Sequence, residues 1–258
     1  MRSIQVTRYV TPLREGGSMP AVVEADDDGM YVLKFKGAGQ GVKALVAELV
    51  AGEIARELGL PVPEIVIAEL NTAIADTEPD PEIQELVRAS GGINLALDYL
   101  PGAFAFDPVV HQVDAKLASR VVWFDALVSN LDRTRRNTNL LVWHRELHLI
   151  DHGAAMYFHH GSHPIVERAQ DRFPLVAEHV LLPMAKALPE VDEEMAAKLS
   201  YSVINDVVAQ VPEDWFAPST GAESMGPSRD DYVEYFVKRL QAPRSFAEEA
   251  MQAHERLA

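Results

Sequence analysis

The sequence predicts an α+β fold of two lobes: an antiparallel sheet carrying one main helix, followed by a mostly helical second lobe. Three observations lead to this prediction. Apolar and polar residues alternate in the first third of the chain, a helical period replaces the alternation over residues 43–58, and helical patterns dominate after Gly102. With 258 residues, of which 48% are hydrophobic, the chain can bury one large core or two smaller ones.

The first lobe is predicted to consist mainly of strands. Residues 4–10 alternate in polarity, and the apolar stretch 21–36 is interrupted at 26–29, which predicts a hairpin joined by a turn. Further strands are predicted over 60–70 and 93–100, with a short helix or loop between them at 78–92. Pro101 and Gly102 then mark a boundary, so the lobes are expected to be residues 1–100 and 101–258 of one domain.

The main helix of the first lobe is predicted over residues 43–58. Val46, Val50, Ile54 and Leu58 recur at helical spacing, and Gly59 follows where a helix commonly ends. Two of its carboxylates are candidate partners for a lysine. Glu53 lies within the apolar stripe and Glu48 nearly opposite it, so periodicity alone favours Glu53 as the inward residue.

The second lobe is predicted to contain a helix over 114–130 and a short hairpin formed by 139–143 and 146–151. From about Arg168 onward, helical segments alternate with prolines. The longest loop is expected over 211–231, before a last pair of helices.

Composition argues against several classes of partner. Lys and Arg total 23 against 39 Asp and Glu, and the resulting charge of −16 repels phosphate backbones and anionic membranes. The absence of cysteine excludes disulfides and thiolate metal sites. No signal peptide or apolar run of membrane-spanning length is present, so a cytoplasmic protein without nucleic-acid or membrane partners is expected.

The segment NLDRTRRNTNLLVWHRELHLIDHG, residues 130–153, carries the chemistry. Asp132 and Asn137 are spaced as D-x-x-x-x-N, and Asp151 opens a D-H-G turn after a short apolar strand. Phosphoryl transfer needs a carboxylate near the attacking hydroxyl, together with amide and carboxylate oxygens on Mg²⁺. A purely structural loop, in which Asn and Asp satisfy backbone groups, is the alternative for the first part of the segment.

Two lysines precede a glycine-rich turn in YVLKFKGAGQG. Lys34 and Lys36 share one strand face, and either could bind a nucleotide phosphate that the glycines allow to approach the backbone. An ordinary turn with exposed lysines is the alternative. The arginines Arg133, Arg135 and Arg136 present a similar choice, because they could contact the γ-phosphate or an acidic acceptor, or form a solvated loop surface.

In this order, the lysine strand, glutamate helix, N-x-D-x-x-x-x-N loop and D-x-G turn resemble the HipA-like kinases. The similarity covers most of the chain and is strongest in YVLKF, AELVAGEIARELGLPVPE and FDALVSNLDRTRRNTNLL. It implies a two-lobed, protein-kinase-like fold related to protein kinases and phosphoinositide kinases. It also implies ATP bound in the cleft with Mg²⁺, and transfer of the γ-phosphate to a hydroxyl acceptor, for which a protein Ser or Thr is one candidate.

Residue by residue, the resemblance implies that Lys34 binds the α- and β-phosphates and that Glu48, rather than Glu53, is its partner on the helix. It likewise implies that Asp132 is catalytic and that Asn137 and Asp151 bind the metal. The stretch INLALDYLPG is similar to the hinge that contacts adenine through its backbone, here Asp98, Tyr99 and Leu100.

The chain departs from the family at two points. A histidine commonly follows the catalytic aspartate by two residues, and this sequence has Thr134 there. The toxin-type members carry an additional N-terminal subdomain that these 258 residues do not provide, so their substrate and DNA-binding partner are not implied.

Two other classes of function compete with an ATP-dependent kinase. A nucleotide-binding pseudokinase that acts as an interaction module would need a missing catalytic group, and none is missing. A metal-dependent phosphohydrolase would use histidines around Asp151, although solvent-facing loop histidines are the simpler interpretation of their spacing. These histidines are His144, His148, His152, His159, His160 and His163.

Overall fold

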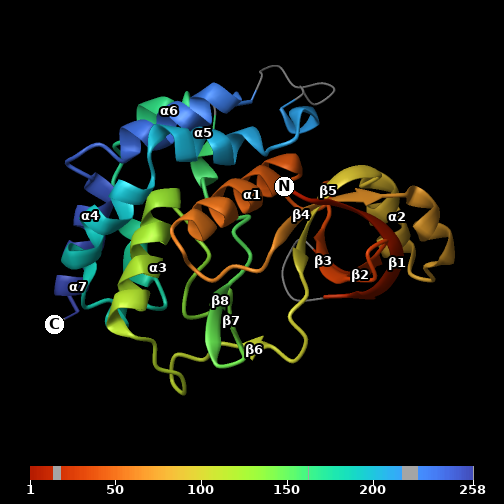
Figure 1. Cartoon of the computed structure of the whole chain (residues 1–258), viewed down its shortest axis with the longest axis horizontal. Coiled ribbons are helices and arrows are strands. Elements are labelled where there is room, and N and C mark those ends of the chain that lie inside the picture. The colour runs from red at the N-terminus through yellow and green to blue at the C-terminus, as the bar shows by residue number, and fades with distance from the viewer. Residues whose placement is uncertain (14–18, 162, 217–225, 258) are drawn as a thin grey trace.

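The computed structural model describes residues 1–13, 19–161, 163–216 and 226–257 (Figure 1). Five strands and their connections form a small barrel, and the remainder of the chain forms a larger, mainly helical part (Figure 1). Helix α1 lies between these two parts (Figure 1). The α+β composition expected from the sequence is therefore present.

The sheet of the first part closes into a barrel, which the sequence did not predict. Its strands are β1 (Ser3–Pro12), β2 (Ala21–Ala25), β3 (Met30–Lys34), β4 (Ile65–Leu70) and β5 (Gly92–Asp98), arranged in the order β1-β2-β3-β5-β4. Four of the five neighbouring pairs, β1–β2, β2–β3, β3–β5 and β4–β5, are antiparallel, whereas β1 and β4 pair in parallel and close the ring. The expectation of a purely antiparallel sheet was wrong at this pair.

The barrel is filled by its own apolar side chains. Its core includes Ile4, Val23, Leu33, Val66 and Ala96, one from each of the five strands. Helix α2 (Pro81–Ala89) and the 3₁₀ helix η1 (Thr72–Thr77) connect β4 to β5, and Ile83 and Val87 of α2 add to the same core. The segment 78–92 is thus partly helical, in agreement with one of the two expected forms.

Helix α1 (Val42–Glu57) ends as the sequence predicts. Gly59 adopts a left-handed φ of 73°, and the amides of Gly59 and Leu60 donate to the carbonyls of Arg56 and Ala55 at 2.8 and 2.9 Å. Nearly all residues from Leu45 to Ala55 are buried. The helix packs closely against β4, since a Cβ at Gly52 would lie 2.4 Å from Ile65 Cδ1.

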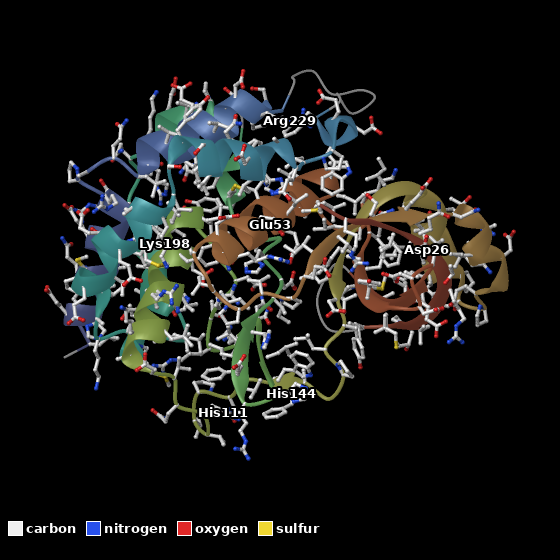
Figure 2. The ribbon with its side chains drawn as sticks, in the orientation of Figure 1. Asp26, Glu53, His111, His144, Lys198 and Arg229 are labelled. Atoms are coloured by element: carbon white, nitrogen blue, oxygen red, sulfur yellow. The ribbon has the colours of Figure 1, made fainter. Side chains whose placement is uncertain are left out.

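The larger part begins with α3 (Ala115–Val128), which the side chain of Asp114 caps by accepting from the Lys116 and Leu117 amides. The predicted hairpin forms as β7 (Leu140–Trp143) and β8 (Glu146–Leu149), and β6 (Phe104–Ala105) pairs with β7. His144 lies at the tip of this hairpin (Figure 2). The remaining helices are α4 (Leu188–Lys198), α5 (Tyr201–Ala209), α6 (Arg229–Arg239) and α7 (Ser245–Glu255), with short 3₁₀ helices η2 (Tyr157–His160), η3 (Ile165–Arg168), η4 (Pro174–Glu178), η5 (Leu182–Met184) and η6 (Glu213–Trp215).

Of the loop expected over 211–231, residues 217–225 lie outside the described part of the chain. Its start contains η6, and α6 begins at Arg229, near its end. None of the helices in the described ranges combines the length and the apolar character that crossing a membrane requires.

Candidate active site

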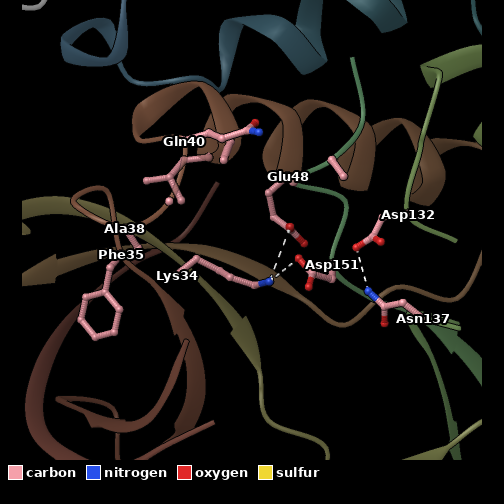
Figure 3. Close-up of a pocket in the computed structure, with 13 residues that line it drawn as sticks. Lys34, Phe35, Ala38, Gln40, Glu48, Asp132, Asn137 and Asp151 are labelled. Atoms are coloured by element: carbon pink, nitrogen blue, oxygen red, sulfur yellow. Dashed lines mark hydrogen bonds and ion pairs between the residues drawn. The ribbon is translucent and has the colours of Figure 1, made fainter. Parts of the chain in front are cut away.

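A pocket between the barrel and the helical part gathers most of the residues singled out in the sequence (Figure 3). It receives Lys34 from the end of β3, Glu48 from α1, and Asp132, Asn137 and Asp151 from the two loops around the β7–β8 hairpin. The glycine-rich turn and the D-H-G turn add Ala38, Gly39, Gln40, Gly153 and Ala154, and Phe35, Ala44 and Leu45 complete the lining. Segments more than 100 residues apart therefore meet at one cavity.

Lys34 is the lysine that faces the acidic residues. Its side chain is 10% exposed, and its Nζ donates to Asp151 Oδ1 at 2.6 Å and lies 3.8 Å from Glu48 Oε2 (Figure 3). Lys36 does not line the pocket; its backbone amide donates to Asn94 Oδ1 at 2.8 Å. Of the two lysines, only Lys34 is placed to bind a phosphate in this cavity.

Glu48, and not Glu53, lies beside Lys34. Glu53 lies 3.7 Å from Arg56 on the same helix, and burial raises its pKa. The choice based on helical periodicity was wrong because α1 is buried on more than one side. Helix α1 contacts β4 and β5 of the barrel and also α5 of the helical part, so a residue off the apolar stripe still points inward.

Charge compensation keeps the buried Lys34–Glu48 pair ionised. Burial alone would raise the pKa of Glu48, but Lys34 and His152 outweigh it and lower this pKa to about 2. For Lys34, burial lowers the pKa, while Glu48 and Asp151 raise it by more, so the net shift is upward. An ammonium group held between two carboxylates is the result.

Asp132 is held by two asparagines. Asn137 Nδ2 donates to Asp132 Oδ2 at 2.7 Å, and Asn139 Nδ2 donates to the same oxygen at 3.2 Å. Sequence reasoning missed Asn139, which has a left-handed φ of 47° and directly precedes β7. Asp132 lines the pocket, and its other oxygen, Oδ1, accepts no hydrogen bond from the described residues.

The remaining oxygens suit a hard divalent cation. Asn137 Oδ1 and Asp151 Oδ2 accept no hydrogen bond from the described residues, and both side chains line the pocket. Amide and carboxylate oxygens are the donors that Mg²⁺ and Mn²⁺ prefer. Asp151 has a φ of 56°, a left-handed conformation uncommon for a residue other than glycine, which aims its carboxylate at Lys34.

Arg133 anchors the loop that carries Asp132 and does not line this pocket. It is 1% exposed, and its Nε donates to Asp125 Oδ2 at 2.6 Å. Its Nη1 donates to the Asn139 carbonyl, and His179 Nε2 lies 2.8 Å from the same Asp125 oxygen. Burial would raise the pKa of Asp125, but Arg133 and His179 outweigh it, and the net shift is downward. Neither interpretation offered for Arg133 from the sequence was right.

Arg135 and Arg136 occupy the tip of the same loop. The Thr134 amide donates to the carbonyls of Asp132 and Asn137, at 3.0 and 2.8 Å, which closes a tight turn around the two arginines. Both are exposed, and neither forms an ion pair within the described ranges. They remain available either to an acceptor or to solvent.

The predicted hinge residues lie at the end of β5, outside the lining of this pocket. The amide of Asp98 donates to the Glu64 carbonyl at 2.8 Å, and that of Tyr99 donates to the Met30 carbonyl at 3.0 Å. Leu100 is buried, and its carbonyl accepts from the Ala103 amide at 3.1 Å. The amides of Asp98 and Tyr99 therefore already donate hydrogen bonds within the fold, which leaves the amide of Leu100 as the remaining candidate donor of the three.

The histidines near Asp151 do not gather around a common point. His144 and His163 are exposed, whereas His152 and His159 are buried, so the expectation of solvent-facing loop histidines was wrong for the latter two. His159 Nδ1 lies 2.9 Å from the Tyr232 hydroxyl, and burial lowers the pKa of His159 to about 3. Within the described ranges, no three His, Asp or Glu residues are arranged to hold a metal ion.

A barrel, a helix with a buried glutamate, and two loops that bring Asp132, Asn137 and Asp151 to one cavity agree with the arrangement expected of a kinase. A sequence profile of the HipA-like kinase family matches residues 6–250. The chain belongs to the HipA-like kinase family and is a phosphotransferase. Comparison with curated proteins gives no significant match.

Solved structures with the same fold are also kinases. The Helicobacter pylori proinflammatory kinase CtkA superposes with a TM-score of 0.53 at 12% identity, with 99% of each chain covered. The Golgi casein kinase bound to Mn and ADP gives a TM-score of 0.54 at 10% identity, covering 98% of this chain and 74% of that one. At such low identity, the likeness establishes the shared fold.

Proposed function

We propose that this kinase transfers the γ-phosphate of ATP to a hydroxyl group with the help of Mg²⁺. The observation that carries the proposal is the contact of Lys34 with both Glu48 and Asp151, in a pocket that Asp132 and Asn137 also line. The binding of Mn and ADP by the structurally similar Golgi casein kinase supports a nucleotide and a divalent cation as ligands. Each of these five positions carries the residue type that the reaction needs, which argues against a pseudokinase.

Each side chain has a defined role in the proposed reaction. Lys34 neutralises charge on the α- and β-phosphates, and Glu48 holds its ammonium in place. Asn137 Oδ1 and Asp151 would hold the metal, which would supply positive charge to offset the negative charge that develops during the transfer. Asp98, Tyr99 and Leu100 would contact adenine through backbone groups left free by the fold, and residues 1–100 and 101–258 would be the two kinase lobes.

Asp132 acts on the acceptor. As the acceptor oxygen forms its bond to the γ-phosphorus, the bond from that phosphorus to the bridging oxygen of ADP breaks. The hydroxyl proton passes to the carboxylate of Asp132, a residue that lines the pocket. A Ser or Thr hydroxyl of a protein is one acceptor that fits this step.

Transfer from ATP labelled at the γ-phosphate tests the proposal, with the protein itself and a cell lysate as acceptors. We expect the parent to label an acceptor in a Mg²⁺-dependent way and Asp132→Asn to lose that labelling. Asp206→Asn, an exposed change on α5 outside the pocket, is the matched control. A parent that hydrolyses phosphoesters with a transition metal, yet binds no nucleotide, would contradict the proposal.

A further inference from the structure

His152, the middle residue of the D-H-G turn, has no assigned role in the mechanism above. It is fully buried, and its ring packs edge-on against Phe124 of α3, with the centroids 5.7 Å apart. Neither ring nitrogen has a hydrogen-bond partner among the described residues, and the same holds for Glu48 Oε1. A buried polar atom without a partner costs about 1–3 kcal/mol, so the placement of these atoms needs an explanation.

Two of these atoms face each other: His152 Nδ1 lies 3.5 Å from Glu48 Oε1. The other carboxylate oxygen, Oε2, lies 3.8 Å from Lys34 Nζ. Glu48 therefore stands between an imidazole and an ammonium group, with one oxygen turned to each. A carboxylate oxygen only accepts, so Nδ1 is the nitrogen that carries the donor hydrogen toward Glu48.

The surroundings favour an interaction with the ionised carboxylate. Glu48 is 1% exposed, and a desolvated carboxylate depends on the few donors it can reach. Both Lys34 and His152 act to lower the pKa of Glu48 against the effect of burial. Among the residues that the structure describes, the ring of His152 approaches Oε1 of Glu48, and Lys34 approaches Oε2.

We propose that His152 is a positioning residue that fixes the rotamer of Glu48, so that the second oxygen of Glu48 is presented to Lys34. A glutamate side chain has three rotatable bonds, and restraint of one oxygen limits where the other can lie. Because His152 directly follows Asp151, this contact ties α1 to the loop that carries the metal-binding aspartate. The inference rests on the proposed kinase function, in which Lys34 and Asp151 serve the nucleotide.

Packing alone is the competing explanation. The imidazole fills space between α1 and α3, where it lies against Phe124 and near Gly52. A phenyl ring fills such space and removes the donor. An asparagine places an amide nitrogen close to the position of Nδ1 but fills less space, so the two substitutions separate the two explanations.

The test compares His152→Phe with His152→Asn in phosphate transfer, nucleotide affinity and melting temperature. If His152 positions Glu48, the Phe variant stays folded while kcat/KM for ATP falls at least about tenfold, whereas the Asn variant stays within about threefold of the parent. In a Glu48→Gln background, His152→Phe should cause little further loss, because the residue through which it acts is already altered. If packing is its role, Phe retains activity, and Asn loses activity in step with its melting temperature.

Crystal structures of both variants distinguish positioning of Glu48 from packing, independently of catalysis. The proposal expects Glu48 Oε2 to remain within about 4 Å of Lys34 Nζ in the Asn variant and to move away in the Phe variant. An unchanged Lys34–Glu48 contact in the Phe variant would overturn it. Loss of the kinase proposal would instead show as a parent without nucleotide binding, and the crystallographic comparison would still distinguish positioning from packing.

Discussion

Lys34 Nζ and Asp151 Oδ1 lie 2.6 Å apart, although 117 residues separate them in the chain. The contact joins the last residue of β3 to the turn that follows β8, and Glu48 approaches the same ammonium from α1. Three elements of the fold therefore converge on one cation. A nucleotide phosphate that binds here would meet a charge already fixed in position, which reduces the entropy lost on binding.

The first prediction concerns the two lysines. A ligand that binds only the folded state at 100 times its Kd stabilises it by about 2.7 kcal/mol, which corresponds to a rise in Tm of roughly 5 °C for a chain of this size. We expect Mg²⁺·ATP to produce a rise of this order in the parent and a much smaller one in Lys34→Ala. Lys36→Ala is the control and should keep the rise; the reverse pattern would refute the assignment to Lys34.

The second prediction separates the two glutamates of α1. Glu48→Gln should lower phosphate transfer by about tenfold or more, since the Lys34 ammonium loses a buried charged partner, while Asp151 still holds it in the folded protein. Glu53→Gln should mainly alter stability, because its carboxylate faces Arg56 outside the pocket. Steady-state kinetics and thermal melts on both variants measure this, and activity lost only in Glu53→Gln would contradict the structure.

The third prediction is a dependence of stability on pH that arises from Glu48. Its pKa in the folded state is lowered from 4.5 to about 2, so its contribution is fully present above pH 4.5 and is lost as the pH falls toward about 2. Other carboxylates, Asp125 among them, add to the same trend. The test therefore compares the pH dependence of Tm in the two proteins. Between pH 5 and pH 3, Tm should fall less steeply in Glu48→Gln than in the parent. Equal slopes would contradict the lowered pKa of Glu48.

The fourth prediction assigns different roles to the arginines of the loop that carries Asp132. Arg133→Ala should destabilise the protein by about 3–5 kcal/mol, because removing one partner of a buried ion pair leaves Asp125 without its main cation. Arg135→Ala and Arg136→Ala should change stability by less than about 0.5 kcal/mol. Urea denaturation of the three variants provides the values.

The exposed arginines can then be tested for contact with substrate. If either binds the γ-phosphate or an acidic acceptor, its alanine variant should show a raised KM for ATP or for the acceptor, with stability intact. If both form only a solvated surface, phosphate transfer should match that of Arg145→Ala, an exposed arginine in the turn of the β7–β8 hairpin.

The sequence predicted local elements and the order of motifs well. Helix α1, its glycine end, the β7–β8 hairpin and the α+β composition follow from periodicity and turn residues, which act over a few neighbours in the chain. The parallel pairing of β1 with β4, which closes the barrel, could not be predicted in this way. Ser3 pairs with Ile67, and no local pattern in the sequence specifies a partner so far away in the chain. Resemblance to the family supplied what periodicity missed, namely the choice of Glu48.

Burial of polar groups was the least predictable feature of the site. Arg133 and Arg135 are neighbours of the same type in one loop, yet one is buried against Asp125 and the other is exposed. The difference arises because Arg133 pairs with Asp125 of α3. His179, 46 residues further along the chain than Arg133, contacts the same carboxylate. His152 is buried for a similar reason, since Phe124 and Glu48 enclose it from two helices.

The most direct test of the central claim compares Asp132→Asn with Asp151→Asn in two assays. Calorimetry measures nucleotide affinity with and without Mg²⁺, and labelled ATP measures phosphate transfer. Asp132→Asn should bind Mg²⁺·ATP about as tightly as the parent while transferring no phosphate, because Asp132 acts on the acceptor hydroxyl. Asp151→Asn, and with it Asn137→Ala, should lose Mg²⁺-dependent affinity and transfer together. A parent that binds Mg²⁺·ATP but transfers its phosphate to no acceptor, or an Asp132→Asn variant that retains transfer, would contradict the account.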